Sequence, residues 1–288
     1  MLDVKPRTVQ TYSGGLRRLV KIGKGVKDPD GVSCMINWSE VYNSFRRQML
    51  DGVDEEDMIL SRKRTCNSVL RNAKALISED AMPYYNSWTM DWAPSLRKLR
   101  GFKKVSAHYT LPSEELILST FKYLENQKCN TKYSMLALAL HAGMRRKEIA
   151  HCRRDWFDLS GDEFNTIKIV QDKKFDPKGH AGSTVLAPEW AQKIYARADG
   201  LDYLFSINLA TDKTMDTSFE PLITDLRALG WNRNSPLHEC RKLYGAFLAT
   251  TDSLYKAQKC LRHSSPQITS DSYSDLIISE KVIGCWAA

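Results

Sequence analysis

Apolar side chains recur every three to four residues along the first hundred positions, and this spacing predicts a series of short helices. The first helix ends at Gly23 and Gly25. A second begins after Asn37 and closes at the turn around Gly52. The inward positions of both helices are apolar or aromatic: Tyr12, Leu16, Leu19 and Val20, then Trp38, Val41, Tyr42, Phe45 and Met49.

A third helix, from about residue 54 to residue 77, is predicted to be basic as well as amphipathic. Acidic residues open it, as a helix N-terminus favours. Its cations are interleaved with short polar side chains, which suit a DNA groove because cations bind phosphates and small polar groups can also meet base edges. A solvated surface helix is the alternative. The predicted DNA-binding residues are Arg62, Lys63, Arg64, Asn67, Ser68, Arg71 and Lys74.

A basic stretch with little apolar periodicity follows this helical region, and it reads as a linker. The sequence LPSEE from residue 111 is then a helix start, with Ser113 as its N-cap. We therefore expect a helical domain over residues 1–100, a basic linker over 101–110 and a second domain over 111–288. Each domain is long enough to bury its own core.

Two runs rich in β-branched residues, 164–170 and 183–187, predict strands in the second domain. The loop between them contains Pro177, Gly179 and Gly182, which predict a hairpin connection. The expected fold class is therefore mainly α with a small antiparallel β-sheet.

A polar set of residues lies on the helix predicted over 237–250. The apolar stripe of that helix consists of Cys240, Leu243, Tyr244, Phe247 and Leu248. His238, Arg241 and Gly245 fall on the opposite face, so core packing does not account for them. We expect the glycine to leave this face bare, where another backbone or a phosphate could approach. For an isolated His-x-x-Arg, a solvated helix face is the alternative.

A further cation lies where an apolar helix ends. Residues 134–141 form that helix, which stops at Gly143, a glycine C-cap. Arg145 follows as the chain restarts toward Glu148, and a cation at such a break can point away from the core. Later in the chain come His263, within the sequence LRHSS, and Tyr273.

In this order, GMRRKEI around Arg145, the pair His238-x-x-Arg241, LRHSS around His263 and the closing Tyr273 resemble the tyrosine recombinases, the phage-integrase family of site-specific DNA recombinases. The resemblance covers about the last 180 residues well and the first hundred in outline. It implies an α+β tyrosine-recombinase catalytic domain preceded by a helical, SAM-like core-binding domain. In the family, the linker lets the two domains clamp opposite sides of a duplex.

The resemblance also implies a catalytic set, which is Arg145, Lys178, His238, Arg241, His263 and Tyr273. Tyr273 would be the nucleophile that forms a 3′-phosphotyrosyl bond. The guanidiniums of Arg145 and Arg241 would match the charge that develops on the non-bridging oxygens. His238 would act as base or relay, since a tyrosine with a pKa near 10 needs help to lose its proton.

Two further roles complete this set. His263 would donate a hydrogen bond to the phosphate. A hairpin lysine would act as an acid toward the leaving 5′ oxygen, and the sequence FDPKGH favours Lys178. Lys173 and Lys174 remain open alternatives, and any of the three lysines could instead be solvated or phosphate-binding.

The sequence departs from the family pattern at two places. Arg262 stands where a glycine commonly sits, and it could crowd the turn or add a phosphate contact. Tyr273 lies ten residues after His263, whereas nine is the commoner spacing, and position nine is Ser272. Among the other tyrosines, Tyr244 and Tyr255 are expected in the core.

Charge and composition agree with a nucleic-acid partner. The net charge is +8 and the pI about 9.0, which favours a polyanion. We expect double-stranded DNA and further copies of this chain as partners, as a tetramer on two DNA sites and a monomer or dimer when free. No signal peptide or membrane span is expected, and the seven cysteines contain no Cys-x-x-Cys. These features favour reduced thiols in the cytoplasm, with the protein associated with the nucleoid.

No metal or nucleotide cofactor is expected, and the chain has no G-x-x-x-x-G-K-[ST] loop. Four possible zinc ligands are His238, Cys240, Cys260 and His263. On a helix, however, residues two apart point roughly 200° away from each other, so His238 and Cys240 could not share one metal ion. The predicted function is a metal- and ATP-independent DNA strand transferase with topoisomerase IB-like chemistry, which integrates, excises or resolves a mobile DNA element. The alternatives are a catalytically inactive DNA-binding protein of the same fold and a zinc-stabilised interaction module.

Overall fold

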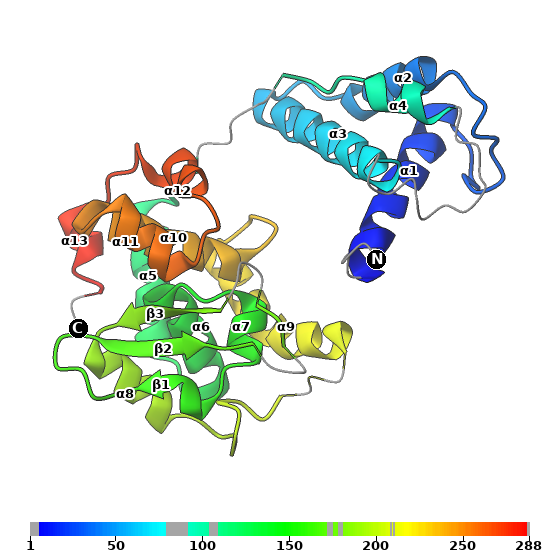
Figure 1. Cartoon of the computed structure of the whole chain (residues 1–288). Helices are drawn as coiled ribbons and strands as arrows, with labels where there is room; N and C mark the ends of the chain where they lie inside the picture. Colours follow the sequence, from blue (N-terminus) through cyan, green and yellow to red (C-terminus); the bar gives the residue numbers. More distant parts are fainter. Residues whose placement is uncertain are drawn as a thin grey trace. The chain divides into compact units, whose positions relative to one another are not determined.

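The computed structural model describes residues 6–78, 92–103, 109–171, 175–177, 181–207, 209 and 211–286. The chain divides into two compact units, Met1–Ser106 and Ala107–Ala288, and each has a hydrophobic core of its own. Helices dominate both units, and the strands in the described residues form one antiparallel sheet in the second (Figure 1). The predicted fold class is thereby confirmed.

The first unit is helical, and its three predicted helices are confirmed. Its elements are α1 (Pro6–Lys24), α2 (Trp38–Leu50), α3 (Glu56–Leu76) and α4 (Ala93–Lys98). Asn37 caps α2, since its side chain accepts hydrogen bonds from the backbone of Ser39 and Glu40. The five predicted inward residues of α2 are all buried.

The second unit combines helices with a three-stranded sheet. Its elements are α5 (Glu114–Glu125), α6 (Asn130–Ala142), α7 (Arg146–Ala150), the 3₁₀ turn η2 (Arg154–Trp156), β1 (Phe157–Asp158), β2 (Asn165–Ile169), β3 (Gly182–Leu186), α8 (Pro188–Ala196), α9 (Asp212–Leu229), α10 (Pro236–Thr251), α11 (Leu254–Leu261), α12 (Pro266–Tyr273) and α13 (Glu280–Ile283). Ser113 caps α5 as predicted, and the helix over 237–250 and both predicted strands are confirmed. The hydrophobic pattern predicted neither β1 nor α9.

The sheet has the order β1-β2-β3 with antiparallel neighbours. Asn165 pairs with Leu186 and Ile169 with Gly182, so β2 and β3 form the predicted hairpin. The Thr184 hydroxyl on β3 donates a 2.7 Å hydrogen bond to the carbonyl of Ala142. This bond ties the sheet to the end of α6.

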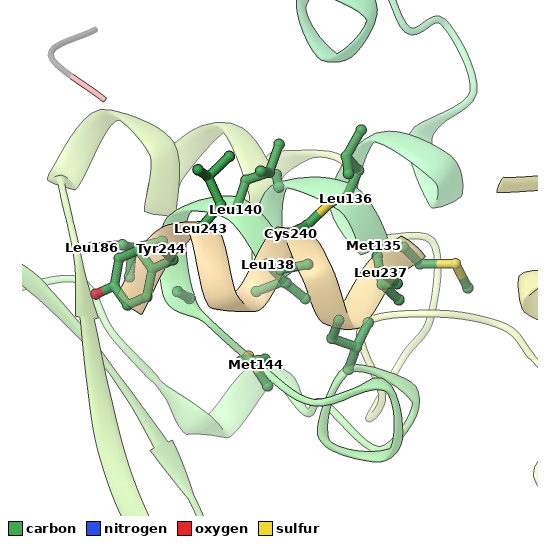
Figure 2. Close-up of a cluster of buried hydrophobic side chains, with 14 of the residues drawn as sticks. Met135, Leu136, Leu138, Leu140, Met144, Leu186, Leu237, Cys240, Leu243 and Tyr244 are labelled. Atoms are coloured by element: carbon green, nitrogen blue, oxygen red, sulfur yellow. The ribbon is translucent and has the colours of Figure 1, made fainter. Parts of the chain in front are cut away.

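The core of the second unit lies around α6, which is buried on every side from Tyr133 to Ala142. Figure 2 shows Leu136, Leu138 and Leu140 of this helix packed among apolar side chains of α10. Tyr244 is in this core as predicted, and its hydroxyl donates to the Val185 carbonyl at 2.7 Å. Among the described residues, no helix is both long and apolar enough to cross a bilayer.

The prediction that Tyr255 lies in the core is wrong, because 64% of its surface is exposed. Tyr255 belongs to α11, whose buried residues are Ala257, Cys260 and Leu261. At 100° per residue these three lie on the far side of the helix from Tyr255. The side chain therefore points away from the core.

His141 is an ionisable group enclosed in the core. It is 2% exposed, and its ring stacks on Trp190 with 3.8 Å between the ring centroids. Neither ring nitrogen has a hydrogen-bond partner within the described part of the chain. Burial lowers the pKa of His141 to about 3, and Lys193 contributes in the same direction. The ring is therefore neutral when the protein is folded at neutral pH.

This buried histidine predicts a loss of stability in acid. Between pH 6.5 and pH 3 the unfolded chain binds a proton at residue 141 that the folded protein does not, so the free energy of unfolding falls as the pH falls. The loss from this residue alone is on the order of 5 kcal/mol across that window. His141→Phe keeps an aromatic ring against Trp190 and should remove this share of the pH dependence. Denaturant titrations at a series of pH values measure it, and an unchanged slope in the variant would contradict the prediction.

The C-terminal segment folds back onto its own unit. The indole nitrogen of Trp286 donates a 2.8 Å hydrogen bond to the Leu140 carbonyl, and its ring stacks on Phe247 with 4.5 Å between centroids. Ser279 donates to Glu114 at 2.7 Å, and Lys281 lies 3.3 Å from the same carboxylate. The tail thus contributes to the core of this unit.

Candidate active site

Arg241 on α10 lies at the centre of the candidate site, with only 2% of its surface exposed. Its guanidinium donates hydrogen bonds to the carbonyl of Gly143, just after α6, and to that of Leu261, at the end of α11. Carbonyl groups at helix C-termini lack helical partners and carry partial negative charge. Two helix ends therefore fix the orientation of this buried cation.

The expectation that this face of α10 lies bare is wrong, because Arg241 and Gly245 are both buried. A Cβ atom at Gly245 would lie 2.6 Å from a methyl carbon of Leu261 and 2.7 Å from Cζ of Tyr273. The close neighbours of the glycine are thus side chains of α11 and α12. The hydrophobic pattern of α10 alone carries no information about α11 and α12, which cover its polar face.

Arg145 reaches the same place from the N-terminus of α7, with 21% of its side chain exposed. Its backbone N–H and its guanidinium both donate to Glu148, each at 2.7 Å, so this carboxylate satisfies the backbone donor that precedes α7. The guanidinium also donates to the Arg262 carbonyl at 3.3 Å and the Leu261 carbonyl at 3.5 Å. Arg145 and Arg241 therefore meet at the C-terminal end of α11.

Glu148 and Arg262 belong to this cluster, although neither was in the predicted catalytic set. Glu148 is 1% exposed and lies 2.7 Å from Arg145, 2.5 Å from Arg262 and 3.8 Å from Arg241. Burial alone would raise its pKa, but the three guanidiniums, Arg262 foremost, bring that pKa below its ordinary value. The carboxylate is therefore ionised. Its position three residues after Arg145 is the spacing of a capping box, and this signal could have identified it.

The two histidines of the candidate set flank the arginines. His263 is partly buried, and its Nδ1 lies 2.9 Å from the Thr269 hydroxyl. More than a third of the His238 surface is exposed, yet the surrounding protein partly desolvates its ring. This desolvation lowers the pKa of each imidazole to about 4, and the charge of Arg241 acts in the same direction. Both rings are neutral at neutral pH, so each has a nitrogen that can accept a proton.

Tyr273 ends α12 and is 4% exposed. Its ring lies parallel to that of His263, with 6.4 Å between centroids and an interplanar angle of 2°. A Cβ atom at Gly245 would lie 2.8 Å from the Tyr273 hydroxyl oxygen, so only glycine leaves room for it. Burial raises the pKa of Tyr273 to about 12, an effect that the nearby charge of Arg241 reduces. The phenol is thus neutral in this state.

Ser272, the residue at the commoner family spacing, faces elsewhere. Its hydroxyl donates a 2.8 Å hydrogen bond to the carbonyl of Ile268 within α12. The geometry brings Tyr273, and not its neighbour, into the cluster of Arg241 and His263.

The packing around Gly245 makes a testable prediction. Gly245→Ala should displace the Tyr273 ring, lower stability by about 1–3 kcal/mol through overpacking, and reduce any reaction of the tyrosine by about 10- to 100-fold. Unfolding midpoints and single-turnover assays measure these effects.

Gly14→Ala in α1 is the matched control, because no atom lies within 4 Å of a Cβ at that position. It should stabilise the protein by about 0.5–1 kcal/mol and leave the reaction unchanged. An active, stable Gly245→Ala protein would contradict the prediction.

The remaining predicted site residues are distributed as follows. Lys178 and its alternatives, Lys173 and Lys174, lie outside the described residues. The side chains of Arg62, Arg64 and Arg71 on α3 are exposed, and those of Lys63, Asn67, Ser68 and Lys74 are half-buried. No three His, Cys, Asp or Glu side chains gather to hold a metal ion in the described part of the chain.

Two of the half-buried residues on α3 already have structural partners. The Asn67 amide donates to the Phe102 carbonyl at 3.0 Å and accepts from the Phe102 N–H at 2.8 Å. Lys74 donates to the carbonyl of Leu99. These bonds hold residues 99–102 against α3, so Asn67 and Lys74 have a structural role that was not predicted.

No protein-family model matches the sequence, and no curated protein matches it significantly. Solved structures of tyrosine recombinases do match. The Tn1549 transposon integrase bound to transposon right-end DNA has a TM-score of 0.56 at 15% identity, over 98% of this chain and 92% of that one. A lambda integrase dimer on a COC′ core site has a TM-score of 0.58 at 12% identity, over 97% and 94%. A lambda integrase tetramer on a Holliday junction has a TM-score of 0.59 at 12% identity, over 97% and 75%.

The protein therefore has the fold of the tyrosine recombinases, as the sequence motifs indicated. At these identities the likeness concerns the fold. The particular activity has to be argued from the site itself.

Proposed function

We propose that this protein is a site-specific tyrosine recombinase, which cleaves and rejoins DNA through a 3′-phosphotyrosyl intermediate. The observation that carries the proposal is the meeting of Arg145 and Arg241, from distant parts of the chain, beside a tyrosine and a neutral imidazole. Forked guanidinium groups suit the non-bridging oxygens of a phosphodiester. The integrase structures with the same fold are complexes with DNA, which supports this substrate.

In the proposed reaction, Arg145 and Arg241 bind the scissile phosphate, and their charge stabilises the negative charge that develops in the transition state. The Tyr273 oxygen attacks phosphorus as His238 accepts its proton. The bond from phosphorus to the 5′ oxygen breaks, and that oxygen takes a proton, for which Lys178 is the proposed donor. His263 donates a hydrogen bond to the phosphate.

Rejoining reverses these steps, so the reaction consumes no water and no nucleotide. A 5′ hydroxyl attacks the phosphotyrosine, and Tyr273 recovers its proton. Because the energy of the broken bond is kept in the intermediate, no external energy source is required.

The rest of the chain would serve DNA binding and assembly. The first unit would act as the core-binding domain over residues 1–100, followed by the linker over 101–110 and the catalytic domain over 111–288. The exposed cations Arg62, Arg64 and Arg71 support a DNA-contacting role for α3. By analogy with the lambda integrase tetramer, we propose assembly as a tetramer on two DNA sites, with the free protein a monomer or dimer.

The decisive experiment uses nicked duplexes that trap the covalent intermediate. Wild-type protein is incubated with duplexes carrying the sequences that flank its own gene, in the presence of a metal chelator. We expect a denaturant-resistant adduct, and mass spectrometry should place the nucleotide on Tyr273. Tight binding without an adduct would favour a DNA-binding protein of this fold that has lost catalysis. An adduct on another residue would reject the assigned nucleophile.

A further inference from the structure

Arg262 has a backbone conformation that is unusual for its residue type. It follows α11 with φ 52° and ψ 49°, the left-handed region, and it is the only non-glycine residue with positive φ in the described part of the chain. The N–H of Arg262 bonds to the Lys259 carbonyl, and that of His263 to the Gln258 carbonyl. This pair of bonds is a Schellman motif, which favours glycine at the position of Arg262. The arginine must therefore make contacts that offset this strain.

The contacts of the Arg262 side chain are internal. Only 6% of the residue is exposed, and its guanidinium lies 2.5 Å from Glu148 and donates to the Cys260 carbonyl at 2.5 Å. Its aliphatic carbons pack on Gly182, where a Cβ atom would lie 3.2 Å away. The side chain is therefore directed at the buried carboxylate of Glu148, away from the surface where a phosphate would approach.

Glu148 has three cations around it, and Arg262 is the nearest. The carboxylate lies 2.5 Å from Arg262 but 3.8 Å from Arg241. Arg262 binds Oε2 of Glu148, the same oxygen that faces Arg241. Without Arg262, this oxygen could bind Arg241, and a phosphate would have to compete with Glu148 for the Arg241 guanidinium. The three guanidiniums and the one carboxylate together leave two positive charges for an anion.

We propose that Arg262 is a positioning residue that holds the Glu148 carboxylate and so leaves Arg241 and Arg145 available to bind the scissile phosphate. The proposal rests on the phosphodiester substrate of the proposed function. Arg262 would thus act on the phosphate site through Glu148 and would not itself contact DNA.

Three substitutions separate charge from backbone at this position. Arg262→Gly and Arg262→Asn both suit the left-handed conformation and remove the cation, whereas Arg262→Lys keeps a cation and the strain. The probe is inorganic phosphate, and its affinity is measured from the shift in unfolding midpoint that it causes at constant ionic strength. We expect about tenfold weaker binding in the Gly and Asn variants and partial recovery in the Lys variant.

The discriminating variant is Glu148→Gln combined with Arg262→Gly. If Arg262 acts by neutralising Glu148, removal of the carboxylate charge should restore phosphate binding to within about threefold of wild type. On nicked duplexes, Arg262→Gly should slow strand cleavage by about 10- to 100-fold with little change in DNA affinity, and the double variant should recover.

Unaltered phosphate binding in the Gly and Asn variants, or a double variant no better than Arg262→Gly, would overturn the proposal. Phosphate binding needs no strand cleavage. A wild-type protein that binds phosphate in this Arg262-dependent way but never forms an adduct would therefore reject the proposed function alone.

Discussion

Tyr273→Phe is expected to abolish covalent attachment to DNA, with a loss on the order of 10⁴-fold or more in single-turnover cleavage. The substitution removes only the hydroxyl group, which makes no hydrogen bond to another described residue, and it leaves the ring beside Gly245. Folding and DNA affinity should therefore be unchanged. Adduct formation on nicked duplexes and a parallel binding titration measure the two properties separately.

Ser272→Ala is the matched control on the preceding residue. The Ser272 hydroxyl bonds within α12, so its removal should change cleavage by less than about twofold. If instead the serine variant loses the adduct and the phenylalanine variant keeps it, the extra residue between His263 and Tyr273 has shifted the nucleophile, and the assignment is wrong.

Arg241→Ala is the second large effect, with an expected loss of about 10³-fold in cleavage. The change removes one of the two guanidiniums proposed to stabilise the transition state. It also removes the hydrogen bonds that Arg241 donates to the carbonyls of Gly143 and Leu261, at a cost of about 2–4 kcal/mol in stability. Single-turnover rates and denaturant titrations test the two effects.

Arg241→Lys separates the chemistry from the fold. A lysine keeps the charge but cannot form the fork, so cleavage should still fall about 10²-fold while most of the stability returns. Lys242→Ala, at the next residue, removes one ion pair of Glu239, which keeps its other ion pair with Arg233, and should cost less than about 1 kcal/mol. Near wild-type cleavage by Arg241→Lys would argue against a bidentate contact between Arg241 and the phosphate.

The sequence predicted the helices best where periodicity and caps agreed. Ser113 caps α5 as expected, and Asn37 caps the helix that was predicted to follow it, since a cap depends only on neighbouring residues. In contrast, α9 carries Pro221 in its interior and a polar first half, so its local pattern was uninformative. Tertiary packing on α5 and α10 stabilises α9, and such packing leaves no trace in a short window of sequence.

The burial of the candidate site was not predicted from the sequence. The arginine of His238-x-x-Arg241 was expected on an open face, and the structure encloses it between helix ends. The role of Glu148 was missed because two of its partners, Arg241 and Arg262, come from elements far away in the sequence. The conformation of Arg262 could not be predicted either, because a motif comparison identifies a missing glycine but not the contacts that replace it.

The attachment of the tail to Glu114 has a mechanical consequence. Glu114 is the first residue of α5, and Ser279 and Lys281 hold it from the other end of the same unit. The Glu114 carboxylate thus joins the first helix of this unit to its C-terminal segment. Anything that pulls the tail away would therefore also remove these two contacts from the first turn of α5.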